Sequence, residues 1–332
     1  MKKLTKIGVS ALAGSLAAVS AAQAGELSVT GSAVLTYTNE DVLNQHTGNT
    51  LGMKNNMSFT GSGDVNGYEV TYFNTLADDG TISSSSLTID MGDMGALAVD
   101  QGVGGNGLDA FDDMLPTAYE ETSDNMTGQL DYAGDGSANV IKYTNTIGGM
   151  SINFAYDPAT GDGDTADGGN STGAAGITGS ATSIAVGLPA FIDGLSAGVA
   201  YGEDDLKGAT TTTDVQSIIG YAKYAYGPVT VGVQQAETSG GTAGSAQKAI
   251  SGYGISLNVN ENLSISYASM EQEYKAAVGG TNVTEESTGI AASYTMGSAT
   301  IVVQQNEQDN AGGSTATTAD EERTEIALTL AF

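Results

Sequence analysis

The chain has 332 residues, with 39 acidic and 10 basic side chains and a formal net charge of −29. This excess of acid excludes nucleic acid as a partner, because phosphate binding needs the opposite sign of charge. Cysteine is absent, which excludes a disulfide framework and suits an exported protein.

The first 24 residues are typical of a secretory signal peptide. They begin with Lys2 and Lys3, continue through a short apolar stretch at 7–19, and end in Ala22-Gln23-Ala24, which fits a small-x-small cleavage site. A membrane anchor is the alternative, but the stretch is short and rich in small residues for a spanning helix. We expect 1–24 to be removed, leaving one domain over 25–332.

After this leader, short segments alternate apolar residues with small or polar ones. The alternation is typical of β-strands with one apolar and one polar face. In the first segment, Leu27, Val29 and Leu35 share one face, and Ser28 and Thr30 share the other. Sixteen strands are expected, at 26–38, 52–62, 68–77, 81–90, 95–100, 138–147, 149–157, 180–188, 194–203, 214–226, 228–237, 247–259, 262–273, 284–296, 298–308 and 321–332.

The connections between these segments alternate in length. Short turns, such as 63–67 and 91–94, alternate with longer polar stretches, such as 39–51 and 158–179. A soluble sandwich would show the same alternation of side chains, but tight turns at one end and longer loops at the other are typical of outer-membrane barrels. The sequence therefore predicts an all-β fold, a transmembrane antiparallel 16-stranded β-barrel.

The longest connection, at about 101–137, follows the fifth strand and carries the main candidate site. Leu108, Phe111 and Leu115 would share one face of a helical turn or two, which suits packing against a wall. A mobile, solvated external loop is the alternative, but the apolar residues favour folding into the barrel as an inward-folded third external loop. The acidic candidates for lining a pore constriction are Asp109, Asp112, Asp113, Glu120, Glu121 and Asp124.

One stretch resembles a known family. Gly136-Ser137-Ala138-Asn139-Val140-Ile141-Lys142-Tyr143, followed by Ile147-Gly148-Gly149-Met150-Ser151-Ile152, is similar to the strand pair after the constriction loop of Rhodobacter-like, alphaproteobacterial porins. With the exported start, the sixteen-strand rhythm and the terminal Phe332, the chain resembles a general porin of Gram-negative bacteria. The resemblance implies a homotrimer in outer-membrane lipid, each barrel being a water-filled diffusion pore narrowed by the third external loop.

The chain departs from that family in its basic residues. The family sets loop acids against a basic cluster, whereas this chain has a single arginine, Arg323, and between 25 and 200 carries only Lys54 and Lys142. Alternation with outward-pointing neighbours places both lysines on the inner face, so they are the candidates for the basic side. Focused negative potential therefore predicts a cation-preferring pore.

A second hypothesis concerns an ion. Asp162, Asp164 and Asp167 lie in a Gly-rich stretch and resemble spaced calcium ligands, although the terminal Glu and flanking helices of an EF-hand are missing. A solvated acidic loop is the alternative. No other cofactor is expected, and a single histidine, His46, gives little support to catalysis.

Three functions remain in competition. The leading hypothesis is an outer-membrane porin for passive diffusion of small hydrophilic solutes and ions, preferably cations. The second keeps the barrel but makes it selective for one solute class. The third is an exported, soluble β-rich adhesin or surface-layer protein, although no fixed-period repeat supports it.

Overall fold

The computed structural model describes residues 25–42, 45–46, 48–78, 80–126, 130, 138–158, 179–205, 212–242, 248–275, 281–316 and 319–332. The expected signal peptide at 1–24 lies outside these residues and stays a prediction. Within the described parts of the chain, no helix is both long and apolar enough to cross a membrane.

Nearly all of the described chain is antiparallel sheet. The strands are β1 (Leu27–Val42), β2 (Gln45–His46), β3 (Leu51–Val65), β4 (Tyr68–Leu76), β5 (Ile82–Asp90), β6 (Ala96–Gln101), β7 (Ala138–Ile147), β8 (Met150–Asp157), β9 (Ala181–Gly187), β10 (Leu195–Asp204), β11 (Thr212–Tyr226), β12 (Val229–Thr242), β13 (Lys248–Asn258), β14 (Leu263–Tyr274), β15 (Val283–Met296), β16 (Ala299–Asp309) and β17 (Glu321–Ala331). Three short 3₁₀ helices accompany them: η1 (Gly92–Met94), η2 (Gly107–Phe111) and η3 (Ala311–Gly313).

Each of the sixteen predicted strands is present, and the two-residue β2 is an addition. β1 and β12 run several residues further than the alternation predicted. In β1 the reason is pairing, because the polar residues Asn39 and Glu40 continue the ladder with Thr324 and Arg323 of β17. Cross-strand bonds therefore extend a strand beyond the point where its apolar pattern ends.

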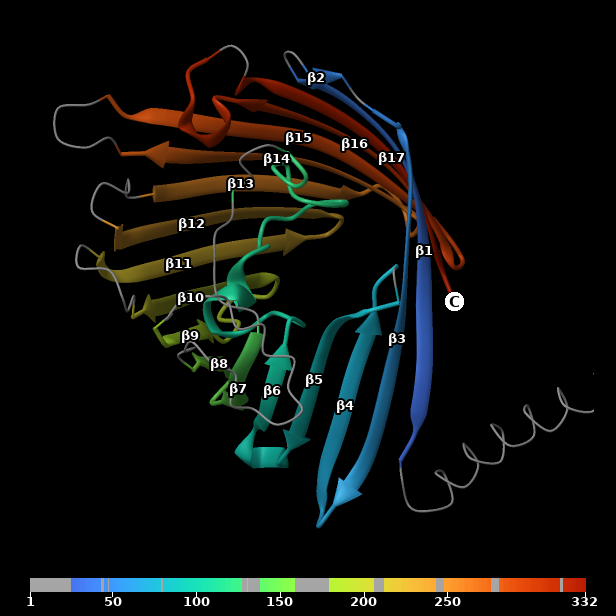
Figure 1. Ribbon diagram of the computed structural model, residues 1–332, viewed down its shortest axis with the longest axis vertical. Helices are drawn as coiled ribbons and strands as arrows, with labels where there is room; N and C mark the ends of the chain where they lie inside the picture. Colours follow the sequence, from blue (N-terminus) through green and yellow to red (C-terminus); the bar gives the residue numbers. More distant parts are fainter. Residues whose placement is uncertain are drawn as a thin grey trace, which may run out of the picture.

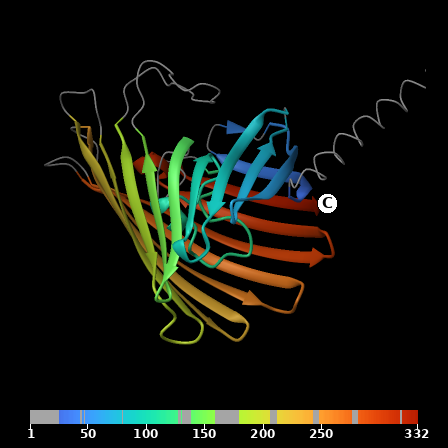
Figure 2. The ribbon, with the colours of Figure 1, turned by 90° about the horizontal axis from the view of Figure 1, so that it is seen from below.

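The sheet closes on itself. Apart from β2, each strand pairs antiparallel with the next, and β1 pairs with β17, for example Leu35 with Leu328 and Thr38 with Glu325. Figure 1 and Figure 2 show the first strand in blue beside the last in red. The predicted closed antiparallel 16-stranded barrel is confirmed, and closure leaves no long open edge.

The two faces of the wall differ in chemistry. Val303 is 46% exposed, whereas its neighbour Gln304 is 4% exposed, and the same contrast separates Val199 from Ala200. Large apolar side chains such as Leu35 and Ile290 cover the exposed face. This is the arrangement of a barrel whose outer surface meets hydrocarbon.

Candidate functional site: an acidic segment fastened to the barrel wall

The connection between β6 and β7 packs against the wall. We call residues 102–126 the acidic segment; Figure 1 shows this stretch in green within the curve of the strands. Leu108, Phe111 and Leu115 are buried. They form one cluster with Leu130 and with wall residues of β9 to β14: Ala185, Ala200, Ile219, Ala236, Ile250 and Met270. The hydrophobic core of the molecule therefore lies between the segment and the wall, on the face opposite the exposed apolar one.

The segment begins with a capped 3₁₀ turn, η2. The Asp109 carboxylate accepts hydrogen bonds from the backbone N–H of Gly105 and, at 3.4 Å, of Asn106. Asn153 of β8 accepts from Gly107 N at 2.9 Å and donates to Gly105 O at 2.7 Å. Asp109 therefore closes the turn, as a capping carboxylate does.

Lys142 and Ser183 add two more ties at this end of the segment. Lys142 Nζ of β7 donates to Gly104 O at 3.2 Å, and Ser183 Oγ of β9 accepts from Leu108 N at 3.2 Å. Gly107 lies close to the wall, since a Cβ at this residue would meet Ser183 Oγ at 1.9 Å, and its φ is +54°. Only glycine fits this approach without strain.

The middle of the segment is held by β12. Gln234 accepts from Met114 N at 2.9 Å and donates to the carbonyls of Phe111, at 2.7 Å, and Asp112. The Phe111 ring lies edge-on to Tyr221 of β11, with centroids 4.9 Å apart. These bonds fix the turn that carries Asp112 and Asp113.

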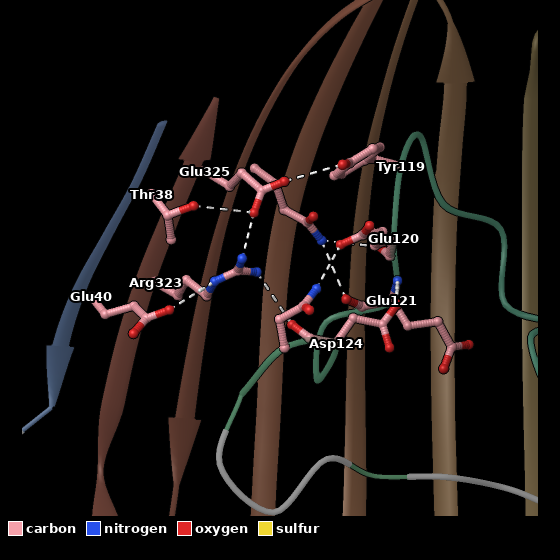
Figure 3. Close-up of polar contacts among 10 residues, drawn as sticks. Thr38, Glu40, Tyr119, Glu120, Glu121, Asp124, Arg323 and Glu325 are labelled. Atoms are coloured by element: carbon pink, nitrogen blue, oxygen red, sulfur yellow. Dashed lines mark hydrogen bonds and ion pairs between the residues drawn. The ribbon is translucent and has the colours of Figure 1, made fainter. Parts of the chain in front are cut away.

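The distal end meets the seam where the barrel closes. Tyr119 OH donates to Glu325 at 3.1 Å, and Gln304 of β16 donates to the carbonyls of Glu120, at 3.0 Å, and Glu121, at 3.3 Å. Figure 3 shows the polar side chains that converge here, from Thr38 and Glu40 of β1, from β17 and from the segment. The seam and the segment therefore share one polar cluster.

Arg323 lies at the centre of this cluster. Its Nε is 3.3 Å from Glu40 Oε1 of β1, a second nitrogen contacts Glu325 of the same strand, and a third donates to Asp124 O at 3.4 Å. Glu40 and Arg323 are also cross-strand partners in the register that closes the barrel. The only arginine of the chain is thus surrounded by carboxylates on the side of the wall that holds the segment.

Two groups at this end titrate abnormally. Burial raises the pKa of Glu120, and the nearby carboxylates of Glu325 and Asp124 raise it further, while Arg323 lowers it. Burial, then Glu120 and Glu325, raise the pKa of the Tyr119 hydroxyl. Both shifts have the cause expected of acidic groups that gather in a partly dehydrated site.

The six candidate acids take different positions. Asp113 is exposed, Asp112 and Glu120 are half-buried, and Glu121 is buried. Asp109 caps η2, and the Asp124 carboxylate accepts from Glu121 N at 2.9 Å. The structure therefore separates acids that shape the segment from acids that face solvent.

The two predicted basic residues take different positions. Lys142 contacts the segment, whereas Lys54 lies on β3, on the face opposite the exposed Met53 and Met57. The calcium hypothesis falls on Asp162, Asp164 and Asp167, which lie outside the described residues, so it stays a prediction. Among the residues that are described, no group of three or more His, Cys, Asp or Glu side chains could hold a metal.

Sequence reasoning missed the wall residues that fasten the segment. Gln234, Gln304 and Arg323 all fall on the polar face of alternating strands, so the same parity that placed Lys142 places them on that face. Alternation along a strand gives the face on which a residue lies but not its position along the barrel axis. That position decides which of these residues contacts the segment.

Comparison with known proteins gives a family and a fold. A family model described as Gram-negative porin matches residues 8–314. A comparison with curated proteins gives no match.

Similar solved structures cover nearly the whole chain. Salmonella typhi OmpF in complex with daunomycin has 12% identity and a TM-score of 0.67, over 93% of this chain and 98% of that chain. An anion-selective porin from Comamonas acidovorans has 16% identity and a TM-score of 0.62, over 92% and 99%. The trimer form of in-vitro folded OmpT from Vibrio cholerae has 12% identity and a TM-score of 0.64, over 92% and 99%. At these identities the likeness shows the fold alone.

Proposed function

The chain belongs to the Gram-negative porin family, and from this premise we propose that its pore prefers cations and is narrowed by the acidic segment. As a porin it is a non-enzymatic channel of the outer membrane for passive diffusion. This confirms the channel of the leading hypothesis and sets aside the soluble adhesin, while the preference for cations stays a prediction. The Rhodobacter-like subtype and selectivity for one solute class stay predictions.

The distribution of charge supports the cation preference. Arg323 forms ion pairs with Glu40 and Glu325, so two carboxylates offset its positive charge and reduce its effect on ions in the pore. Lys142 is held by a carbonyl of the segment. Acids on the segment, above all the exposed Asp113, thus outnumber these two basic residues, and focused negative potential concentrates cations. The state of Arg323 is the observation that carries this proposal.

The location of the segment's contacts suggests where solutes pass. Described contacts join the segment to strands from β7 to β17, and the wall of β1, β3 and β4 carries neutral hydroxyls and amides. Ser32 bonds to Asn56 at 3.0 Å, and Ser58 bonds to Thr75 at 2.9 Å. We infer that the segment lies in the lumen and that solutes pass between Asp113 and this wall, where Lys54 is the basic residue predicted to point inward.

Reversal potentials in a salt gradient test the proposal. In planar bilayers the wild-type protein should favour potassium over chloride, and Asp113→Asn should lower that preference because it removes a charge at the constriction. Asp309→Asn is the matched control, since Asp309 is exposed on the outward face of β16. Anion preference of the wild-type pore would overturn the proposal.

We also propose that the protein is a homotrimer whose copies meet through the outward face of β4 to β7. β4, β5 and β6 have 9, 9 and 6 residues, and a tilted strand needs ~9–11 residues to cross a bilayer, so β6 is short for lipid contact. This outward face carries polar residues: Ser85 donates to Gln101 at 3.2 Å, and Gln101 donates to Asn139 at 3.0 Å. Asn74 and Ser85 are each only 8% exposed.

Such a face suits protein better than hydrocarbon. Polar side chains in lipid are costly unless all their hydrogen-bonding groups find partners. The described outward positions of β4 to β6 carry no charged side chain, whereas the outward faces of β14 to β17 carry Glu271, Glu286, Glu307 and Glu322. Copies of an acidic protein would repel one another least through the uncharged face.

A further inference from the structure

We propose that Gln234 is a positioning residue that sets the orientation of the turn carrying Asp112 and Asp113. Its effect on ion selectivity rests on the proposed function, but its effect on the position of the turn does not. No charge resides on Gln234, so any change in selectivity on its replacement would have to come from a change in where the acids lie.

The side-chain amide of Gln234, which we call the fork, binds the turn through both its oxygen and its nitrogen. Gln234 is 2% exposed and uses both ends of its amide on the segment. The oxygen accepts from Met114 N at 2.9 Å, and the nitrogen donates to the carbonyls of Phe111, at 2.7 Å, and Asp112. Three bonds thus fall on main-chain groups of Phe111, Asp112 and Met114, on both sides of Asp113.

These bonds decide which side chains face the wall. With the main chain held, Phe111 and Leu115 are buried against the wall, while Asp113 between them is exposed. Because the fork binds main-chain atoms, it would hold any residue at these two positions. The position of the turn is therefore separate from the charge that it carries.

Close packing of Pro116 against two wall glycines, next to the fork, limits movement of the turn along the wall. Pro116 lies over Gly232 of β12, the strand that carries Gln234. A Cβ at Gly232 would come within 2.6 Å of Pro116 Cδ, and a Cβ at Gly254 of β13 would be 3.1 Å from the same atom. Loss of the fork would leave the buried carbonyl of Phe111 without this partner, next to the closely packed Pro116. A buried polar group left without its partner costs enough to change the conformation that the turn prefers.

A unique thiol measures the position of the turn directly. The chain has no cysteine, so Asp113→Cys gives one reactive group in the full-length protein. The rate of its reaction with a charged, water-soluble thiosulfonate should change by about tenfold when Gln234→Leu is added, since lost hydrogen bonds to buried groups shift the turn. Gln235→Leu is the matched control, because Gln235 is the next residue of β12 and is exposed on the opposite face.

Selectivity gives the second readout. On the background with Asp113 intact, Gln234→Leu should lower the potassium preference without removing a charge, and Gln235→Leu should leave it unchanged. An unchanged thiol reaction rate in Gln234→Leu would overturn the positioning role. A changed rate in a pore that shows no cation preference would instead support the positioning role and reject the proposed function.

A conservative variant covers the case in which Gln234→Leu does not fold. In Gln234→Glu the protonated carboxyl group keeps a donor and an acceptor, whereas the carboxylate only accepts. The thiol reaction rate is measured in the double variant Asp113→Cys with Gln234→Glu and divided by the rate in Asp113→Cys alone. This ratio should be near one at acid pH and should differ from one at neutral pH. A ratio that stays at one across this range would also overturn the proposal.

Discussion

Arg323 shows how a single basic side chain is used in a strongly acidic chain. It is 9% exposed, pairs with Glu40 and Glu325, and donates to the Asp124 carbonyl. A buried arginine without its carboxylates, or buried carboxylates without their arginine, would be strongly destabilising. Its contacts therefore join β1, β17 and the acidic segment, and its paired charge contributes little positive potential to the pore.

Glu120 gives a prediction about pH at this same cluster. Its pKa is raised by burial and by Glu325 and Asp124, so the folded protein holds the proton more tightly than the unfolded chain. The stability that this group contributes is present at acid pH and is lost as pH rises from the ordinary glutamate range through the raised pKa. Glu120→Gln removes this loss, so the variant should gain thermal stability relative to the wild type as pH rises.

Unfolding midpoints between about pH 4 and pH 8 would check this, because the window begins near the ordinary glutamate pKa. Glu307→Gln, at an exposed outward position of β16 outside this cluster, is the control substitution. A constant difference for Glu120→Gln across the same range would contradict the prediction.

The acidic segment is held to the wall largely through its main chain. Neutral side chains of five strands bind its main chain: Asn153 of β8, Ser183 of β9, Gln234 of β12, Ser266 of β14 and Gln304 of β16. Two of them occur in a repeated Val-Gln-Gln sequence, at 233–235 and 303–305, where the first Gln faces the segment and the second is exposed. Because these wall residues bind the main chain, the segment can be held in place whatever side chains it carries.

Wall glycines provide room for this segment, which predicts the effect of filling that room. A methyl group at Gly232 would overlap Pro116, so Gly232→Ala should push the segment away from the wall at a cost of ~1–3 kcal/mol. Because we place the segment in the lumen, single-channel conductance should fall. Gly220→Ala is the matched control, since its methyl group would have no neighbour closer than 3.9 Å. Equal conductance in the two variants would contradict the prediction.

At the scale of the whole molecule, closure and the two faces of the wall determine what the barrel contacts. Pairing of β1 with β17 removes the free edges, so interactions with neighbours involve side chains rather than strand addition. The outward surface is apolar over most strands; over β4 to β6 it also carries neutral polar residues, such as Ser85 and Gln101, and no charged side chain among the described outward positions. This contrast is the basis for placing other copies of the chain on that sector and lipid on the rest.

The proposed trimer can be tested by a charge on each kind of outward surface. Gln101→Lys places a charge among the polar residues of β5 to β7, where burial between copies would leave it unpaired, so trimers should be lost while folded monomers persist. Gln305→Lys changes the same residue type at an exposed outward position of β16 and should leave trimers intact. Gel mobility without heating and chemical cross-linking would measure both. Trimers of equal stability in the two variants would contradict the proposed sector.

The sequence by itself determined the strands and their faces, because a period of two is a local property. Alternation such as Ile326, Leu328 and Leu330 against Thr329 and Ala331 marks a strand wherever it occurs. Together with short and long connections it was sufficient to predict a 16-stranded barrel. The apolar spacing of Leu108, Phe111 and Leu115 was likewise sufficient to predict that the longest connection packs against a wall.

Only the tertiary structure decided which residues meet that connection. Met114 and Gln234 are 120 residues apart, and Asp124 and Arg323 are 199 apart, so no local pattern links them. Their meeting depends on strand register and on the curvature of the closed sheet, which set the height of each inward side chain. The same geometry gave Asp109, Asp113 and Asp124 different positions, although the sequence presents them as equivalent acids.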